Sequence, residues 1–459
     1  MRGDYVSSLQ DVIDEKIAWF WSYRLPSMVK RDLDLGNVPA PAQGNRVKVI
    51  VGVRRCGKTW RLFQEIARLE REGVPRQRIL YFNFDDERLR PYDRLLPSQV
   101  MERFYTMSPG AREGAYLFLD EIQDIPDWGV FMRRMVDTEA LCCYVTGSSS
   151  KMLSTEVATE FRGRATHYEL SPYSFREYAR AQGVREDMLD PGTALPEQGR
   201  LDLSRLCDEY LVRGGFPEAQ ALDPIERIDL LQDIAANVVA ADVVERHDFG
   251  SARIARMVCT QCLATSARKL SLTRLHNQLR SRGFSIGWEK LVALVGYLEE
   301  ANILYRVPEY TTSVAENSRK ASKVYANDQS LMIAVSSAAT SDVGLALETA
   351  VYLELRRRAS FGRKNQVMSY DVKEGSTSFE VDFVEGDALL GEATSLLQVS
   401  SSIAARSTRK RELRSLEKAM VASGVDTGTV ITLNERETIA TDAGSIEVVP
   451  AWRWLLRET

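Results

Sequence analysis

The segment that most constrains the fold of this chain is the loop Gly52-Val53-Arg54-Arg55-Cys56-Gly57-Lys58-Thr59, which has the pattern G-x-x-x-x-G-K-T. An apolar run at residues 47–51 comes directly before it, and a helical pattern at residues 60–71 comes directly after it. A glycine-bearing turn at the N-terminus of a helix presents backbone N–H groups and a positive dipole end to a polyphosphate. The segment is therefore interpreted as a phosphate-binding loop, and a chance match in a glycine-bearing turn is the alternative.

Each residue type in this loop has a role in such a site. The glycines let the backbone come close to phosphate, Lys58 reaches the β- and γ-phosphates, and the Thr59 hydroxyl binds Mg2+. The other ligands of Mg2+ are mostly water and phosphate oxygen. The residues of this segment that are predicted to surround the nucleotide are Gly52, Arg54, Arg55, Cys56, Gly57, Lys58, Thr59 and Trp60.

Composition sets only broad limits. With 459 residues, of which 44% are hydrophobic, the chain is long enough for about three domains with their own cores. Its 60 basic and 64 acidic side chains give a net charge of -4, so the overall field does not favour nucleic acid or membrane. Residues 1–11 lack the regions of a signal peptide and no apolar run has the length of a bilayer span, so a cytoplasmic location is expected.

Six cysteines are scattered along the chain, and only Cys259 and Cys262 form a C-x-x-C pair. The sequence has no second pair and only three histidines. Two thiols that pack on a helix are therefore expected rather than a zinc or redox site. Magnesium is the only metal predicted.

A second group of candidate site residues follows an apolar run at positions 116–119, where Asp120 and Glu121 are adjacent. The apolar run predicts a strand buried on both faces of a parallel sheet, and ligands bind at the carboxyl ends of such strands. Asp120 would serve the metal and its water shell, and Glu121 would polarise the attacking water. Without the phosphate loop, an ordinary turn at the end of a strand is the alternative.

Several ordered blocks of the sequence resemble one family, the bacterial and archaeal AAA-type ATP-binding proteins that carry a C-terminal domain of uncharacterised function. The first blocks are the phosphate loop, N-F-D-D-E-R at residues 83–88, L-D-E-I-Q ending at Gln123, and T-G-S-S-S-K starting at Thr146. Further blocks follow in the same order at residues 162–164, 171–177, 213–218 and 242–247. The resemblance spans nearly the whole chain and implies ATP as the nucleotide, Mg2+ as the metal and hydrolysis to ADP and phosphate.

The resemblance also implies roles for polar groups beyond the two acids. In AAA-type ATPases a polar side chain after the strand predicted at residues 141–145 senses the γ-phosphate, and Ser148 or Thr146 fits that role by position, with a serine-rich loop as the alternative. Arg162 and Arg164 flank Gly163 and are candidate arginine fingers, in cis or from a neighbouring subunit, that neutralise charge on the transferring phosphoryl group. A solvated basic turn is the other interpretation.

The predicted fold class is α/β, with a parallel-sheet P-loop AAA-type domain followed by a helical lid, a winged helix and a C-terminal α/β nuclease-like domain. The linker is inferred from the glycine, proline and acidic residues gathered at positions 181–200. The predicted boundaries are 1–45 for an N-terminal helical segment, 46–180 for the P-loop AAA-type ATPase domain, 181–250 for the linker and helical lid, 251–330 for the winged-helix domain and 331–459 for a degenerate restriction-endonuclease-like domain.

The region at residues 251–306 has the outline of a winged helix, with helices starting at Ser271 and Gly287 and strands near residues 304–307 and 324–326. Nine basic residues against three acidic ones give it a local charge excess of +6. This excess favours salt-dependent contact with DNA phosphates, and internal packing of a solvated basic face is the open alternative. The basic residues are Arg253, Arg256, Arg268, Lys269, Arg274, Arg280, Arg282, Lys290 and Arg306, and the acidic ones are Glu289, Glu299 and Glu300.

The last region resembles a restriction-endonuclease-type fold, with Glu348 on a helix, Asp382 on a strand and Gln398-Val399-Ser400 on the next strand. In active members of that class, the third element is glutamate-x-lysine and completes a site that binds Mg2+ and activates water. Gln398 and Ser400 lack the carboxylate and the lysine, so a degenerate binding module is predicted rather than a working nuclease. Basic residues of the following helix are candidates for contact with nucleic acid, or else face water, namely Arg406, Arg409, Lys410, Arg411 and Arg414.

The predicted function is hydrolysis of ATP that drives or gates the C-terminal domains. A nucleotide-gated DNA-binding switch with slow hydrolysis is the first alternative, and a Mg2+-dependent nuclease that uses Glu348 and Asp382 is the second. Whether subunits form a homo-oligomer stays open. The predicted catalytic residues are Glu121, Lys58, Arg164 and Arg162, and the predicted metal ligands are Thr59 and Asp120.

Overall fold

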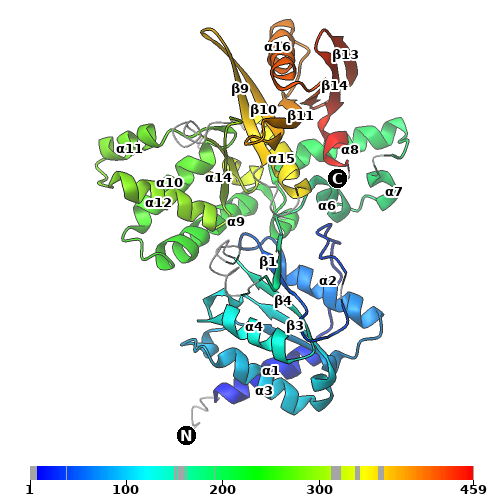
Figure 1. Cartoon of the computed structure of the whole chain (residues 1–459), viewed down its shortest axis with the longest axis vertical. Coiled ribbons are helices and arrows are strands. Elements are labelled where there is room, and N and C mark those ends of the chain that lie inside the picture. The colour runs from blue at the N-terminus through cyan, green and yellow to red at the C-terminus, as the bar shows by residue number, and fades with distance from the viewer. Residues whose placement is uncertain are drawn as a thin grey trace. The chain divides into compact units, whose positions relative to one another are not determined.

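The computed structural model describes the chain except for residues 1–7, 38, 149–151, 153–160, 162, 191, 312–321, 336–341, 360–365 and 458–459. The predicted finger residue Arg162 therefore lies outside the described residues. Contacts divide the chain into two compact units, Met1–Leu170 and Ser171–Thr459, and each is described by itself (Figure 1).

The described residues of the first unit form a five-stranded sheet in the order β2-β3-β4-β1-β5. Every pair of neighbouring strands in it is parallel, which confirms the predicted α/β class for this unit. Parallel strands place their carboxyl ends at one edge, where ligands bind in such sheets. The strands are β1 (Val47–Val51), β2 (Ile79–Asn83), β3 (Ala115–Asp120), β4 (Leu141–Gly147) and β5 (Ala165–Glu169).

Helices cover both faces of this sheet (Figure 1). Alternate residues of β1, such as Val47 and Val49, belong to one buried cluster with residues of α1, α3 and α4. On the opposite face α2 packs its Phe63 ring against Tyr81 of β2, with 4.9 Å between ring centroids. Each large apolar side chain buried in this way contributes about 1.5–3 kcal/mol. The helices are α1 (Leu9–Ser22), α2 (Lys58–Arg71), α3 (Leu96–Met107) and α4 (Trp128–Thr138).

The second unit begins with a helical region. Cys259 and Cys262 lie on α10 of this region, and both are buried, as expected of thiols that pack on a helix. No described helix is both long and apolar enough to span a bilayer. The elements are α6 (Phe175–Ala181), α7 (Glu186–Leu189), α8 (Glu197–Arg213), α9 (Pro224–Asn237), the π-helix Val238–Glu245 and α10 (Ala252–Ala264).

A three-stranded antiparallel sheet in the order β6-β8-β7 follows, together with two helices. The helices start one residue after the positions expected from sequence, and the two predicted strands are present, while β6 was not foreseen. The elements are β6 (Arg268–Lys269), α11 (Leu272–Ser281), α12 (Trp288–Glu300), β7 (Leu304–Val307) and β8 (Lys323–Ala326).

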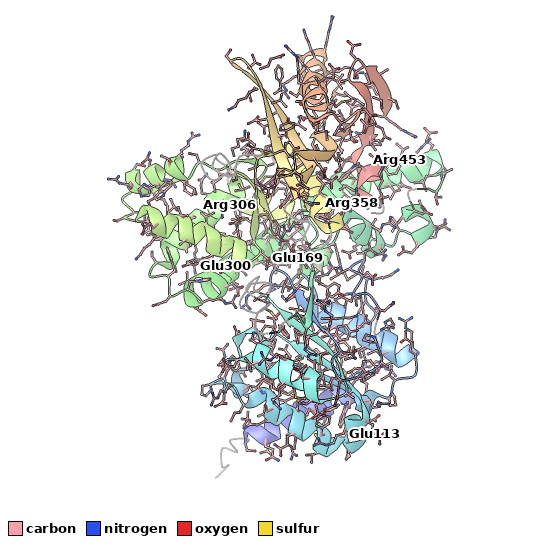
Figure 2. All side chains as sticks on the ribbon, in the orientation of Figure 1. Glu113, Glu169, Glu300, Arg306, Arg358 and Arg453 are labelled. Carbon is pink, nitrogen blue, oxygen red and sulfur yellow. The ribbon has the colours of Figure 1, made fainter. Side chains whose placement is uncertain are left out.

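The C-terminal part is a six-stranded mixed sheet in the order β13-β14-β12-β11-β10-β9. Residues of α16 pack with apolar residues of the sheet in one buried cluster. Figure 2 shows Arg358 of α15, whose guanidinium donates to Trp454 O at 2.7 Å. The elements are α14 (Gln329–Val335), α15 (Val343–Arg358), β9 (Val367–Glu374), β10 (Thr377–Asp387), β11 (Glu392–Val399), α16 (Arg406–Ser423), β12 (Thr427–Thr432), β13 (Glu437–Thr441), β14 (Gly444–Pro450) and α17 (Ala451–Leu455).

Main-chain hydrogen bonds join the small sheet to this large one. Tyr310 N donates to Ser369 O at 2.7 Å, and Ser369 N donates to Pro308 O at 2.9 Å. Pro308 follows β7 directly and Ser369 lies on the edge strand β9. An isolated bridge between Glu309 and Ser369 therefore joins the end of the small sheet to the edge strand of the large sheet.

Candidate functional site

The loop between β1 and α2 has the backbone shape of an anion site. Gly57, the N-cap of α2, has a φ of 100°, and Arg55 also adopts a left-handed conformation with a φ of 64°. No side chain caps the first turn of α2, so its N–H groups and dipole point at the loop. A Cβ on Gly52 would lie 2.1 Å from Leu170 O, so glycine is required where β1 ends. A non-glycine residue with positive φ costs about 1–3 kcal/mol and is common at ligand sites.

Lys58 lies inside this loop with 4% of its surface exposed. Its ammonium group donates to Gly52 O at 3.2 Å and lies 3.3 Å from Glu121 Oε1. Burial alone would lower the pKa of Lys58, but the negative charge of Glu121 outweighs it and leaves the pKa raised. A permanently charged ammonium group therefore stands at the carboxyl end of the sheet.

Asp120, the last residue of β3, is fully buried and is held by hydroxyl groups. Thr59 donates to Asp120 Oδ2 at 2.6 Å, Tyr81 donates to the same oxygen at 2.9 Å, and Thr146 donates to Oδ1. Burial and the nearby charge of Glu121 raise the pKa of Asp120, and the hydroxyl bonds oppose that rise. The sequence did not point to Tyr81, because its position depends on the pairing of β2 with β3.

The Thr59 and Asp120 side chains fit a magnesium ion. Both offer oxygen atoms, and their atoms lie 2.6 Å apart at the start of α2. Proteins bind Mg2+ through one or two carboxylates while phosphate and water complete the octahedron, so one carboxylate and one hydroxyl are a sufficient protein contribution.

Glu121 is held as an ionised acceptor directly after β3. Its backbone is left-handed, with a φ of 55°, and its N–H donates to Thr146 Oγ1 at 3.1 Å. Burial would raise the pKa of Glu121, but the charge of Lys58 and a 2.9 Å bond from Gln123 leave it lowered. The Oε1 atom of Gln123 is buried and has no hydrogen-bond partner among the described residues. A carboxylate and an amide oxygen thus lie together beside the loop.

The other predicted nucleotide contacts are placed as follows. Thr146 contacts both acids, and Ser148 is fully buried just after β4. Cys56 is buried, the charge of Arg54 acts on Glu121, and Trp60 is 45% exposed on the first turn of α2. All of these residues lie near the carboxyl edge of the sheet or on the helix that starts there.

Arg164 is not brought to this site. It directly precedes β5, whose first residue Ala165 pairs with Val47, so it lies at the amino edge of the sheet. The phosphate loop starts after Val51, four residues further along β1 and roughly 13 Å away at the rise of a strand. Arg164 instead forms a 2.8 Å ion pair with Asp137. A finger role in cis is therefore wrong for Arg164, because the guanidinium belongs to the opposite edge.

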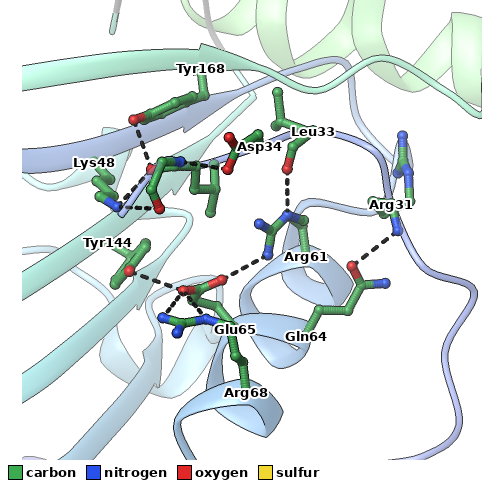
Figure 3. A network of polar contacts seen from close by, with 12 residues as sticks. Arg31, Leu33, Asp34, Lys48, Arg61, Gln64, Glu65, Arg68, Tyr144 and Tyr168 are labelled. Carbon is green, nitrogen blue, oxygen red and sulfur yellow. Dashed lines mark hydrogen bonds and ion pairs between the residues drawn. The ribbon is translucent and has the colours of Figure 1, made fainter. Parts of the chain in front are cut away.

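A further contact to the loop comes from the irregular segment between α1 and β1, which sequence reasoning missed. Arg31 donates to Cys56 O at 2.8 Å, and Arg31 N donates to the Gln64 side chain of α2. Figure 3 shows this segment, residues 31–37, tied to α2 by Arg61, which bonds to Leu33 O, and to the sheet by Lys48, which donates to Leu35 O at 2.6 Å. The segment carries no apolar periodicity, so no sequence signal marks it.

In the second unit, several basic residues predicted to face DNA are bound within the chain. Arg306 pairs with Glu299, Lys269 pairs with Asp371, and on α16 Arg409 pairs with Glu437. Arg274, Arg280 and Arg282, on and just after α11, form no ion pair within the described residues. The same holds there for six other basic residues on α10, α12 and α16, namely Arg253, Arg256, Lys290, Arg406, Lys410 and Arg414.

Comparisons with known proteins agree with the geometry of the first unit. Residues 44–179 match the AAA domain family AAA_14, and residues 204–342 match a domain of unknown function, DUF8612. The first match includes β1–β5, the loop and both acids. Residues 44–179 are therefore an AAA-type P-loop domain.

Two relatives extend over most of the chain. An uncharacterized protein of Methanocaldococcus jannaschii is 29% identical over 441 residues, covering 94% of this chain and 91% of that protein. An uncharacterized protein of Haemophilus influenzae is 26% identical over 340 residues, covering 74% of this chain and 79% of that protein. Among solved structures, the Orc1 protein of Aeropyrum pernix in complex with DNA is 16% identical; the match covers 73% of this chain and 94% of that one, with a TM-score of 0.26.

Proposed function

We propose that the first unit binds ATP with Mg2+ and hydrolyses it to ADP and phosphate. One arrangement carries the proposal, namely the Lys58 ammonium at the N-terminus of α2, 3.3 Å from Glu121, beside the Thr59–Asp120 pair. A site that only holds phosphate needs the loop and the lysine. Hydrolysis also needs a group that orients water, and the ionised Glu121 supplies it. The AAA domain match supports the same class of function.

The chain's own residues divide the work of this reaction. Lys58 exchanges its contact with Glu121 for the terminal phosphates, and the N–H groups of the first turn of α2 bind phosphate oxygens. Thr59 and Asp120 would hold Mg2+, which would neutralise charge on the β- and γ-phosphates. Freed from Lys58, Glu121 Oε1 accepts a proton from water, and Gln123 orients the carboxylate through Oε2.

A link from this site to the second unit supports a gating role for hydrolysis. Leu170, the last residue of the first unit, donates from its N–H to Val51 O at 2.7 Å. Its carbonyl lies where a side chain on Gly52 would be. The chain thus leaves the sheet beside the first residue of the phosphate loop, so a change in the loop on phosphate release acts directly on the connection.

The test is phosphate release by purified full-length variants. Lys58→Ala should lower kcat/KM by at least about 10²–10³-fold, the effect of losing one group that stabilises developing charge. Glu121→Gln should bind a fluorescent ATP analogue normally but turn over about 10²–10⁴-fold more slowly. Glu113→Gln, an exposed change in the same unit, is the matched control. Unchanged turnover in both site variants would sink the proposal.

DNA binding gated by nucleotide is the second candidate function, and one feature of the second unit favours it. Between Arg268 and Trp288 the sequence has five basic residues and no acidic one. The exposed face of α11 lines a shallow hollow of about 540 Å³ with hydroxyl, amide and guanidinium groups. The lining residues are Ser271, Thr273, Arg274, Asn277, Gln278 and Ser281. Amide and guanidinium groups on a helix are the side chains that read base edges, and the basic charge suits phosphate.

A salt-titrated DNA shift, with and without MgATP, tests this candidate. Arg274→Ala combined with Arg280→Ala should reduce the slope of log affinity against log salt by up to about 2, because each lost phosphate contact releases about one fewer counterion. Arg205→Ala, which removes a 70% exposed guanidinium on α8, serves as the control. A slope that is the same in all three proteins contradicts a role for α11.

A further inference from the structure

The strongest cluster of charged groups outside the nucleotide site surrounds Lys323. Its ammonium group lies 2.8 Å from Glu380 Oε1, 2.8 Å from Asp382 Oδ1 and 3.0 Å from Glu348 Oε1. The lysine is on β8 of the small sheet, and the acids are on β10 and α15. Only 4% of Lys323 is exposed. Three N–H donors thus meet three carboxylates.

Two of these carboxylates are the ones expected to hold magnesium in a nuclease. Magnesium draws its oxygen ligands to about 2.0–2.1 Å in an octahedron. Here the central cation is a nitrogen with three acceptors at hydrogen-bond distance, and the second oxygen of Asp382 is taken by Val399 N at 2.9 Å. No group of three or more His, Cys, Asp or Glu in the described part of the chain could hold a metal. The residues present do not fit a divalent ion.

The position of the third nuclease ligand is also closed. Gln398 stands there, and its amide nitrogen donates to Glu412 Oε2 at 2.8 Å. Tyr325, two residues after Lys323 on β8, donates to Glu348 Oε1 at 2.8 Å. Every group that faces the carboxylates from β8 is therefore a donor. This set of partners satisfies the acids without a bound ion.

Lys323 also does not replace the missing catalytic lysine of the nuclease motif. A lysine that orients an attacking water needs a donor directed at that water. The ammonium group of Lys323 donates to Glu348 and Asp382 and lies 2.8 Å from Glu380, so carboxylates of its own chain surround it. Burial would lower the pKa of Lys323, but Tyr325, Asp382 and Glu348 hold it well above its usual value, so it remains a cation.

We propose that Lys323 is a built-in cation that takes the place of the divalent metal in this nuclease-like site and fastens the small sheet to the C-terminal sheet. A second lysine supports the fastening role. Lys269 of β6 is the cross-strand partner of Lys323, and its ammonium lies 2.5 Å from Asp371 Oδ2 and 3.7 Å from Glu380 Oε2. Glu380 therefore bridges two lysines on adjacent strands.

The proposal makes a gain-of-binding prediction. Without the ammonium, three carboxylates face one another in a largely buried place, and like charges there strongly favour a cation. Lys323→Met removes the charge and keeps an unbranched side chain. This variant should acquire one Mn2+ site per chain, which the wild type lacks, and the added change Asp382→Asn should abolish it.

The experiment titrates Mn2+ into the nucleotide-free full chain and follows free Mn2+ by electron paramagnetic resonance. Lys373→Met, an exposed change on β9, is the matched control and should bind as the wild type does. Wild-type binding of Mn2+ that disappears in Asp382→Asn would overturn the proposal. A folded Lys323→Met variant that binds no additional Mn2+ would overturn it as well.

A second readout covers loss of folding in the variant. If Lys323→Met is unfolded in chelator, Mn2+ at 100 times its Kd should raise the ratio of folded to unfolded protein about 100-fold, because the ion binds only the folded state. The double variant Lys323→Met, Asp382→Asn should show no such rescue. Failure of Mn2+ to restore the single variant contradicts the proposal. Neither readout depends on ATP hydrolysis. A negative result for the Lys323 proposal is therefore distinguishable from a negative result for the proposed function.

Discussion

Thr146→Val is expected to slow ATP hydrolysis although Thr146 was only one of two alternative sensor residues in the sequence. Its hydroxyl donates to Asp120 Oδ1 and accepts from Glu121 N at 3.1 Å, so one group orients both acids. Valine has nearly the same shape but can make neither bond. The substitution therefore removes the link between Asp120, the proposed magnesium ligand, and Glu121, the proposed water-orienting residue, and leaves the packing of β4 nearly intact.

The size of the effect follows from the two bonds. A hydrogen bond to a charged group contributes about 1.5–3 kcal/mol, and one between neutral groups about 0.5–1.5 kcal/mol. Thr146 is fully buried, so water does not replace the lost donor. A combined loss of about 2–4 kcal/mol, if expressed in the transition state, corresponds to a fall in kcat/KM of about 30- to 1,000-fold.

Steady-state phosphate release with MgATP measures this fall, and a thermal melt of each variant checks folding. Thr146→Ser is the matched control, because serine keeps the hydroxyl and loses only the methyl group. Serine should stay within a few-fold of the wild type. Equal losses in the valine and serine variants would assign the effect to packing, and wild-type activity in the valine variant would refute the reasoning.

Two further outcomes are expected. Arg31→Met should weaken binding of a fluorescent ATP analogue about tenfold by freeing Cys56 O, and an unchanged Kd contradicts this. The side chains of Arg164 and Asp137 are 41% and 37% exposed, so their ion pair holds Arg164 only weakly. If Arg164 acts as an arginine finger in trans, the specific activity of the wild type should rise with protein concentration while that of Arg164→Ala stays constant. A wild-type specific activity that does not change with concentration argues against this role.

Much of the nucleotide site could be predicted from sequence because its parts are local. The G-x-x-x-x-G-K-T pattern fixes a strand, a turn and a helix within a few residues, and the apolar run before Asp120 fixes a buried strand end. What the sequence could not give is the pairing between distant strands. Tyr81 reaches Asp120 only because Asn83 and Asp120 are register partners in β2 and β3.

In the second unit, too, contacts between distant segments could not be predicted from the sequence. Local patterns predicted α11, α12, β7 and the strand that carries Asp382. The nuclease motif has a lysine at the position of Ser400, and the sequence predicted only the loss of that cation, because the motif is defined along one strand. Lys323, 59 residues before Asp382, supplies an ammonium group from a different sheet, and no pattern within a window of sequence connects them.

Lys58 and Lys323, two of the buried lysines in the described part of the chain, both form ion pairs, but these pairs suit different purposes. Lys58 meets one carboxylate and two backbone carbonyls at a helix N-terminus, where the N–H groups and dipole can accept additional negative charge, so its contact with Glu121 is exchangeable for phosphate. Lys323 meets three carboxylates and no helix end, so an incoming anion would face repulsion and an incoming cation would find its ligands taken. Breaking one partner of a buried pair is expensive because the other charge is left alone. The first arrangement is therefore suited to ligand exchange, and the second to holding two sheets together.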